Sequence, residues 1–424
     1  MFEKMKGERI VVIKLKIFMG FIVGLAALSL VLAIPAQAKV EGDTITFGAA
    51  ISFTGKYSTA GKHTKNGYDL AVKRINEMGG VKVGGKAYKI KVKYYDDEST
   101  PARAGQLADR LIKQDKIKYM LGPYGSGPTK GIAPITEKYK IPMVEANGAS
   151  RSLFNKGYRY LFAVLSTSEQ YLAESINLIA EEFEKSGRKP SDVKVAVAVE
   201  NDPFSMDIRA GVLEDAKRYN MKIVIDDKLP KELTDMTATL TKVKALKPDL
   251  LVVSGHSKGA VLVVRQMAQM RVDVPMLAIT HCESADVIGK FGAQADYTLC
   301  ATQWAPTMSY KDQWFGSAGD YAVTFKKEYG YTPPYQAAES TAAVLVYVDA
   351  IRRAGSFDTE KVRDALAATS METFYGRIDF DDTGKNIAKP MVLRQVQNGK
   401  FVPVAPSSFA TGKVIYPRPK WSER

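Results

Sequence analysis

Residues 117–147, IKYMLGPYGSGPTKGIAPITEKYKIPMVEAN, contain two short apolar runs separated by a glycine-rich turn and a helical pattern. A glycine-rich turn at the start of a helix binds anions, because the first backbone N–H groups of the helix have no partner within it. A nucleotide phosphate is excluded, since the phosphate-loop pattern needs Gly-Lys and then Ser or Thr, whereas Gly127 is followed by Pro128 and Thr129. The segment therefore predicts a strand, a helix and a second strand, with a turn that holds another kind of anion.

The same alternation continues on both sides of this segment. Apolar, β-branched runs precede it at 45–51 and 89–97, and each is followed by apolar residues at helical spacing. After a pause at 158–170, four more strands are predicted, at 193–201, 221–227, 249–255 and 274–280. We therefore expect an α/β fold with two doubly wound parallel-sheet lobes. Ligands of such sheets bind beyond the carboxyl ends of the strands, which predicts a site in the cleft between the lobes.

The N-terminus has the pattern of a secretory signal. Basic residues up to Lys16 are followed by an uncharged run, Ile17 to Ala38, that ends in Ala36-Gln37-Ala38. We predict a signal peptide over residues 1–38, cleavage after Ala38 and export to the periplasm as a soluble protein. An uncleaved membrane anchor is the alternative, because the apolar run reaches the ~18 residues at which a span becomes possible. The remaining 386 residues suit two domains of ordinary size.

Charge and cysteine content restrict the other classes. The net charge of +14 is spread along the chain in alternation with acids, which argues against a nucleic-acid partner and at most favours an anionic ligand. Only three histidines are present and no two ligands have zinc spacing, so we expect no metal and no cofactor. Cys282 and Cys300 each lie in or beside a predicted strand, where disulfide geometry is demanding. We expect them to be unpaired, although an oxidising compartment leaves pairing open.

One motif points to an enzyme. GHSKG, residues 255–259, matches the nucleophile elbow of serine hydrolases and has a predicted strand before it and a helix after it. That chemistry needs a histidine later in the chain to accept the proton of Ser257. The only later histidine is His281, and it does not lie on a late strand. A tight strand-to-helix turn explains GHSKG, and we expect no enzymatic activity.

A binding cleft explains more of the sequence. Six predicted turns at strand carboxyl ends combine hydroxyl residues with aromatic ones: 53–61, 124–129, 147–150, 204–205, 256–257 and 280–283. Hydroxyl and N–H groups suit a carboxylate, while aromatic edges suit an apolar tail.

Several stretches resemble the branched-chain amino-acid-binding (leucine/isoleucine/valine-binding) family of ABC-importer solute-binding proteins. They are ITFGAAISFTGKYSTAGKHTKNGYDLAVKRINEMGG, YYDDESTPARAGQLADRLI, LGPYGSGPTKGIAPITEKYKIPMVEANGAS and FYGRIDFDDTGKN. The resemblance implies the type I periplasmic-binding-protein fold, with two lobes joined by three crossings near 160–168, 300–306 and 375–382. Lobe 1 is then residues 43–162 plus 306–375, and lobe 2 is residues 163–305 plus 376–424.

The resemblance also implies a ligand site. The α-carboxylate matches Ser126, Asn147 and Ala149, with Ser150 adjacent; Ala149 stands where a threonine is usual. In the other lobe, Phe204 and His256 match aromatic contacts, and Thr280 aligns with the acid that takes the ligand's ammonium. Glu283, three residues on, is the replacement that we expect, with Glu200 as the second choice. Trp304 is expected to stack on a flat ligand or to pack for rigidity. Ala60, in the first turn, completes the set.

We therefore expect a monomeric binding protein that carries a small carboxylate-bearing solute to an ABC-transporter membrane permease. An amino acid of the branched-chain type is the favoured ligand. Aromatic or other non-amino carboxylates are the alternative, since Thr280 and Phe204 suit a ligand without an ammonium group. A ligand sensor and a serine hydrolase that uses Ser257 are less favoured alternatives.

Overall fold

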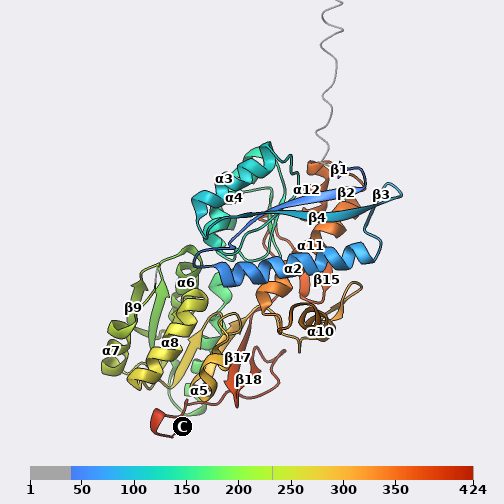
Figure 1. Cartoon of the computed structure of the whole chain (residues 1–424). Helices are drawn as coiled ribbons and strands as arrows, with labels where there is room; N and C mark the ends of the chain where they lie inside the picture. Colours follow the sequence, from blue (N-terminus) through green and yellow to red (C-terminus); the bar gives the residue numbers. More distant parts are fainter. Residues whose placement is uncertain (1–39, 232, 424) are drawn as a thin grey trace, which may run out of the picture. The chain divides into compact units, whose positions relative to one another are not determined.

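The computed structural model describes residues 40–231 and 233–423, so the predicted signal peptide lies outside the described residues. Lobe 1 is built on a sheet with the strand order β3-β4-β2-β5-β6-β7, to which β1 adds by pairing with β2 (Figure 1). Its strands are β1 Val40–Glu41, β2 Thr44–Ile51, β3 Val81–Val83, β4 Lys86–Asp96, β5 Met120–Leu121, β6 Met143–Glu145 and β7 Leu161–Ala163. Helices α2 Ser58–Glu77, α3 Pro101–Lys113, α4 Ser126–Tyr139, α10 Ala318–Tyr329, α11 Tyr335–Ala354 and α12 Thr359–Ala367 accompany this sheet.

Lobe 2 is built on a sheet with the strand order β18-β17-β12-β11-β10-β8-β9. Its strands are β8 Lys194–Glu200, β9 Lys222–Leu229, β10 Leu250–Ser254, β11 Met276–Ile279, β12 Thr298–Thr302, β17 Val392–Gln397 and β18 Lys400–Ala405. Its helices are α5 Ala173–Lys185, α6 Pro203–Arg218, α7 Thr237–Leu246, α8 His256–Met270 and α9 Val287–Phe291. Two small sheets pair β13 Lys311–Asp312 with β14 Gly316–Ser317 and β15 Ser370–Thr373 with β16 Gly376–Asp379. Short 3-10 helices are η1 Arg151–Lys156, η2 Ser168–Gln170, η3 Pro190–Asp192, η4 Gly292–Ala295 and η5 Trp421–Glu423.

The strands expected from the sequence are confirmed, and their pairing is parallel. β2 pairs with β4 and β5 in lobe 1, and β8 pairs with β9 and β10 in lobe 2. In β8, KVAVAVE, every residue after the first is buried, which is why the run carries no polar alternation. The two lobes therefore have the doubly wound α/β architecture that the sequence predicts.

The hairpin of β17 and β18 was not predicted. Its strands pair antiparallel across the turn Asn398-Gly399, in which both residues have positive φ, 50° and 67°. Asn-Gly is the dipeptide that a two-residue hairpin turn favours, so the sequence did contain a signal for this hairpin.

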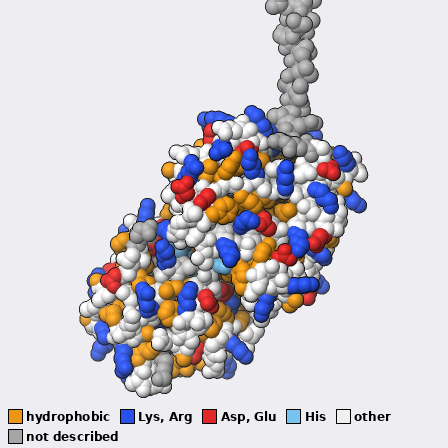
Figure 2. Space-filling view, viewed as in Figure 1, with side chains coloured by type: hydrophobic (Ala, Val, Ile, Leu, Met, Phe, Trp, Pro, Cys, Tyr) orange, Lys and Arg blue, Asp and Glu red, His pale blue; other side chains and the backbone are white. Residues whose placement is uncertain are grey.

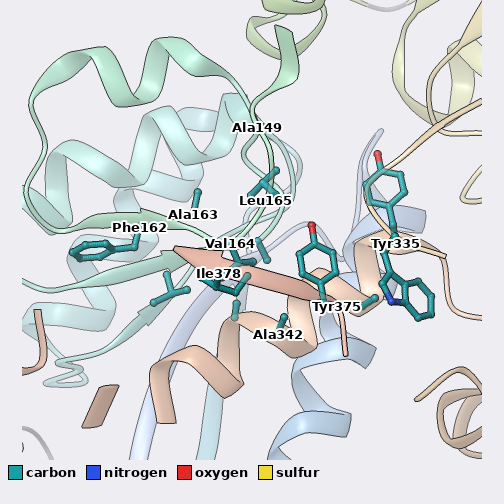
Figure 3. Packing of buried hydrophobic residues seen from close by; sticks show 14 of the residues in the cluster. Ala149, Phe162, Ala163, Val164, Leu165, Tyr335, Ala342, Tyr375 and Ile378 are labelled. Atoms are coloured by element: carbon teal, nitrogen blue, oxygen red, sulfur yellow. The ribbon is translucent and has the colours of Figure 1, made fainter. Parts of the chain in front are cut away.

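Helix α11 forms the centre of the lobe 1 core. Residues 335–351 are all buried, and the helix packs against α2 so closely that a Cβ on Gly67 would lie 2.3 Å from the Ala337 carbonyl oxygen. Figure 3 shows Ala342 of α11 near Ile378 of β16 and Val164, which follows β7. The core thus joins segments that are far apart in the sequence.

Three crossing segments lie side by side where the chain passes between the sheets. The Ser166 carbonyl accepts a hydrogen bond from Gln303 Nε2 at 2.8 Å, and Ser166 Oγ donates to the Lys389 carbonyl at 2.7 Å. Lys389 Nζ in turn donates to the Gln303 carbonyl. All three residues are buried, so the crossings share one hydrogen-bonded cluster. Lys385 and Asn386 still contact the end of β7, which favours a third crossing later than 375–382; the exact lobe boundaries stay a prediction.

The two cysteines form a disulfide, Cys282–Cys300, with Cα atoms 5.9 Å apart, so the expectation that they are unpaired was wrong. That expectation placed both residues in or beside strands. Cys300 is in β12, but β11 ends at Ile279, so Cys282 lies in the turn beyond it. Ile279 is the parallel partner of Cys300, and a turn that starts there can bring Cys282 over the neighbouring strand.

Charged side chains of both signs are scattered over the face shown in Figure 2, which agrees with their alternation along the sequence. Within residues 40–231 and 233–423, no helix has both the length and the apolar character that crossing a bilayer demands.

Candidate functional site

The turns at the carboxyl ends of the strands meet between the lobes, as expected. Tyr124, which follows β5, places its hydroxyl 3.1 Å from His256 Nδ1 and 2.9 Å from His281 Nε2. His256 begins α8 after β10, and His281 follows β11. Burial, together with the charge of His256, lowers the pKa of His281 well below its ordinary value, so this imidazole is neutral. A lobe 1 phenol thus hydrogen-bonds two lobe 2 imidazoles.

Aromatic rings fill the space around this contact. We call this buried region between the lobes, around Tyr124, His256 and His281, the seam. The ring of Phe204 lies 5.1 Å from that of Tyr171 and 5.3 Å from that of His281. The remaining cavity is about 10 Å³, close to the volume that one water needs. It is lined by Tyr124, Gly125, Asn147, Tyr171, Phe204, His256, His281, Tyr335, Gln336 and Glu339. Of the expected site residues, Asn147, Phe204 and His256 therefore border the seam.

Ser126, Ala149 and Ser150 come together as expected, but their polar groups bond to one another and to lobe 2. Ser126 Oγ accepts a hydrogen bond from the Ser150 N–H at 2.9 Å, and Ser150 Oγ donates to the Asp207 carboxylate. Asn147 Nδ2 donates to Ser340 Oγ at 3.0 Å. The Asp207 carboxylate therefore binds the Ser150 hydroxyl, one of the groups expected beside a ligand carboxylate.

The glycine-rich turn lies against an acid of the protein itself, which sequence reasoning missed. Glu145, at the end of β6, accepts hydrogen bonds from the N–H groups of Asn147 and Gly148 at 2.6 and 2.7 Å. It also accepts one from Thr129 Oγ1, in the first turn of α4, at 2.9 Å. Burial raises the pKa of Glu145 to about 7, although these hydrogen bonds act in the opposite direction. Glu145 packs so closely against Gly122 that a side chain does not fit there, since a Cβ on Gly122 would lie 2.1 Å from Glu145 Oε2.

The other expected residues divide between packing and a second cavity. Ala60 is buried in a small cluster with Tyr57 and Tyr124, and the Thr280 hydroxyl lies 3.5 Å from that of Ser254. Trp304 is buried, donates through Nε1 to the Phe374 carbonyl at 3.1 Å and packs edge-on against Tyr321. Trp304 and Glu283 nevertheless both line a much larger cavity beside the seam.

This cavity, the side pocket, has a volume of about 700 Å³. Thr59, His63 and Tyr331 line it from lobe 1, and Glu283 and Arg394 line it from lobe 2. Its remaining lining residues are Cys282, Ser284, Asp286, Val287, Ile288, Lys290, Trp304, Ala305, Pro306, Thr307, Thr332, Pro333 and Phe401. The side pocket is large enough for a small organic ligand, whereas the seam is not.

A cluster of possible metal ligands lies at the edge of the seam. Oxygen or nitrogen atoms of Glu200, Asp202 and His256 lie within 4.8 Å of one another. Asp202 caps α6 by accepting from the Phe204 N–H at 2.9 Å. Burial acts to raise the pKa of Asp202, but the charge of His256, 3.4 Å away, and the hydrogen bond from the Ser205 N–H lower it to about 2. The Lys56 ammonium, 2.7 Å from Glu200 Oε1, already supplies a cation, so we assign no metal here.

Among the described residues, the candidate nucleophile hydrogen-bonds to another serine and not to a histidine. Ser257 Oγ is 2.9 Å from Ser284 Oγ, while His281 Nε2 bonds to Tyr124 and His63 Nδ1 bonds to Tyr331 at 2.8 Å. It is His256, one residue before Ser257, that has the positive φ of 50° in this turn. The geometry of a serine hydrolase triad is therefore not formed by these residues.

Known proteins resemble the chain over most of its length. A Leu/Ile/Val-binding protein homolog 7 of Brucella abortus is 23% identical over 407 residues, covering 93% of this chain and 99% of the relative. A homolog 8 of Brucella suis is 21% identical over 386 residues, covering 88% and 93%.

Two solved structures share the fold and hold different ligands. The branched-chain amino acid transporter substrate-binding protein LivJ of Streptococcus pneumoniae, in complex with isoleucine, has a TM-score of 0.74 and 24% identity, over 86% of this chain and 100% of that one. A solute-binding protein of an ABC transporter from R. palustris, in complex with benzoate, has a TM-score of 0.71 and 19% identity, over 85% and 95%.

The sequence model of the periplasmic binding protein family matches residues 44–400 of this chain. This match spans both lobes and every expected site residue, and it agrees with the type I fold described above. The family is one of solute-binding proteins and not one of enzymes. The chain belongs to the periplasmic binding protein family.

Proposed function

We propose that the protein is exported to the periplasm, binds a small carboxylate-bearing solute between its lobes, and delivers it as a monomer to the membrane permease of an ABC importer. The observation that carries this proposal is the side pocket of about 700 Å³, which residues of both lobes line. A site shared by two lobes couples ligand binding to their closure, because the ligand is fully enclosed only when both lobes contact it.

The crossings and the seam support closure as the binding motion. The buried cluster of Ser166, Gln303 and Lys389 gives the lobes a common pivot. Opening about that pivot breaks the contact of Tyr124 with His281 and the ion pair of Lys56 with Glu200. These lobe-to-lobe bonds stabilise the closed form, in which a bound solute is withheld from water.

Two ligand classes fit this proposal. Amino acids of the branched-chain type are supported by the Leu/Ile/Val-binding relatives and by the isoleucine complex of a structural neighbour. Aromatic carboxylates are supported by the benzoate complex of another neighbour and by Trp304 and Phe401 in the wall of the side pocket. The carboxylate role of Ser126, Asn147, Ala149 and Ser150 stays a prediction.

A thermal-shift screen tests the proposal. The panel contains the proteinogenic amino acids, their deaminated counterparts, and benzoates. A ligand at a hundred times its dissociation constant adds about 2.7 kcal/mol to stability, which is readily measured. A shift with any member, verified by calorimetric titration, supports the proposal, and no shift across the whole panel contradicts it.

Delivery to a permease and the absence of catalysis need separate tests. Uptake of the identified solute by cells that lack the gene distinguishes a transport role from that of a ligand sensor, because a sensor leaves uptake unchanged. Ester hydrolysis by the wild-type protein that is lost in Ser257→Ala would instead support the serine hydrolase.

A further inference from the structure

The side pocket contains a buried pair of opposite charges. Arg394 is only 4% exposed, and its Nη2 contacts Oε1 of Glu283. Among the described residues, neither Arg394 Nε nor Glu283 Oε2 has a hydrogen-bond partner. Burial lowers the pKa of Arg394 to about 9, so the guanidinium is poorly compensated where it lies. Each member of the pair thus has a buried hydrogen-bonding atom without a protein partner, and both residues line a ligand-sized cavity.

The fold holds this pair in place. Arg394 of β17 is the antiparallel partner of Cys300 of β12. Cys300 is bonded to Cys282, the residue before Glu283. One disulfide therefore connects the strand beside Arg394 to the turn that carries Glu283. The ring of Phe401 lies 4.5 Å from the Arg394 guanidinium carbon, which fixes the cation from another side.

The rest of the wall is suited to an apolar group. Val287, Ile288, Trp304, Pro306 and Phe401 contribute apolar surface to the side pocket. The volume of about 700 Å³ exceeds what an amino group and a carboxylate alone require. A solute with a bulky apolar body fits these walls.

We propose that the Glu283–Arg394 pair opens to receive a zwitterion, with the ligand's carboxylate on Arg394 and its ammonium on Glu283. The proposal rests on the proposed function and specifies its ligand as an α-amino acid with a large apolar side chain. Inserting a zwitterion exchanges one ion pair for two and leaves no buried charge alone. A carboxylate without an ammonium leaves Glu283 unpaired, and an amine without a carboxylate leaves Arg394 unpaired, so both are disfavoured.

Calorimetric titration of the wild-type protein gives the first test. The probes are leucine, its deaminated analogue isocaproate and its decarboxylated analogue isoamylamine, and likewise phenylalanine, hydrocinnamate and phenethylamine, with benzoate added. The expected result is that the amino acids bind at least tenfold more tightly than either analogue. Binding confined to benzoate or the deaminated acids overturns the zwitterion inference and leaves the proposed function standing. No binding of any carboxylate or amino acid overturns both.

The second test changes the pair. Arg394→Gln and Glu283→Gln are each expected to weaken amino-acid binding by about 10- to 100-fold. Lys244→Gln and Glu184→Gln, exposed residues on α7 and α5, make the same charge changes away from the pocket and should bind as the wild type does. Unchanged amino-acid affinity in both pocket variants overturns the inference. If Arg394→Gln does not fold, two measurements remain, the affinity of Glu283→Gln and the comparison of analogues on the wild-type protein. Weakened amino-acid binding in Glu283→Gln supports the inference, and unchanged binding overturns it.

Discussion

Lys56 and Glu200, which are 144 positions apart, form an ion pair of 2.7 Å between lobe 1 and lobe 2. Lys56 lies in the turn after β2, and Glu200 is the last residue of β8. Glu200 is buried, and its pKa is raised mainly by that burial while the charges of His256 and Lys56 oppose the rise. The pair therefore contributes to the closed arrangement of the lobes.

Replacing Lys56 by methionine is expected to destabilise the protein by about 1–2 kcal/mol. The change leaves Glu200 buried without its ammonium partner, and the expected loss is smaller than that for a fully buried pair because the Lys56 side chain is 16% exposed. The free energy of unfolding in urea measures the effect. Lys73→Met, which breaks the exposed pair of Lys73 with Glu328, is the matched control and should change little. An equal loss of unfolding free energy in the two variants would show that the lobe-to-lobe pair stabilises the protein no more than an exposed pair does.

Glu145 predicts a pH dependence of stability. Its pKa is raised from 4.5 to about 7 by burial, so the folded protein binds the proton more tightly than the unfolded chain does. The stability linked to this proton is fully present below about pH 4.5 and is lost as the pH rises through 7.

Glu145→Gln should remove this dependence without disrupting the contacts. The amide oxygen can still accept from Asn147 and Gly148, and the amide NH₂ can donate to Thr129 Oγ1. The Thr129 hydroxyl proton then goes to the Gly125 carbonyl instead of to residue 145. The variant should therefore gain stability relative to the wild type as the pH rises from 5 to 7, by up to about 1.4 kcal/mol for each pH unit, and should gain little more above pH 7. Urea unfolding at several pH values measures this, and parallel curves for the two proteins would contradict it.

Reducing the Cys282–Cys300 disulfide should affect both stability and binding. The bond closes a loop with a sequence separation of 18, for which the chain-entropy argument gives about 3 kcal/mol. Cys282→Ser with Cys300→Ser should lose about that amount in urea unfolding. Because the bond also positions Glu283 against Arg394, the double variant should bind its amino acid more weakly under conditions in which it is folded. The expected loss of stability with an unaltered amino-acid affinity would contradict a role of the disulfide in ligand binding.

The sequence predicted the architecture because its signals are local. Each strand of the parallel sheets is a short apolar run, and each turn at a carboxyl end belongs to one segment, so Phe204 and His256 could be assigned to the cleft without the structure. Arg394 could not be assigned, because β17 reads VLRQVQ and lacks a clear apolar alternation although its first five residues are buried. Gln395 is buried there because its Oε1 accepts from the Ile415 N–H at 2.8 Å, a contact that no local pattern predicts.

Glu283 and Ser126 illustrate the same limit. Glu283 was expected to replace the acid with which Thr280 aligns, and the structure gives Glu283 a cationic partner from a distant strand. Ser126 was expected to face a ligand carboxylate, yet its hydroxyl accepts from Ser150, and neither residue lines the seam or the side pocket. Side-chain partners that come from distant segments decide both cases.

Ser126→Ala distinguishes two possible binding sites for the ligand, the side pocket and the glycine-rich turn that carries Ser126. If the side pocket holds the ligand, the variant loses only the bond from the buried Ser150 N–H, and it should be destabilised by about 1–3 kcal/mol with unchanged affinity. If the ligand's carboxylate lies on Ser126, as the resemblance implies, affinity should fall by a similar free energy.

Melting and calorimetric titration of the variant with the best amino acid from the screen measure both quantities. Thr136→Ala, which removes a buried hydroxyl in the last turn of α4 that bonds to the Ala133 carbonyl, controls for general loosening of lobe 1. Weakened binding in Ser126→Ala but not in Thr136→Ala would place the carboxylate on the glycine-rich turn after all, and would remove it from Arg394.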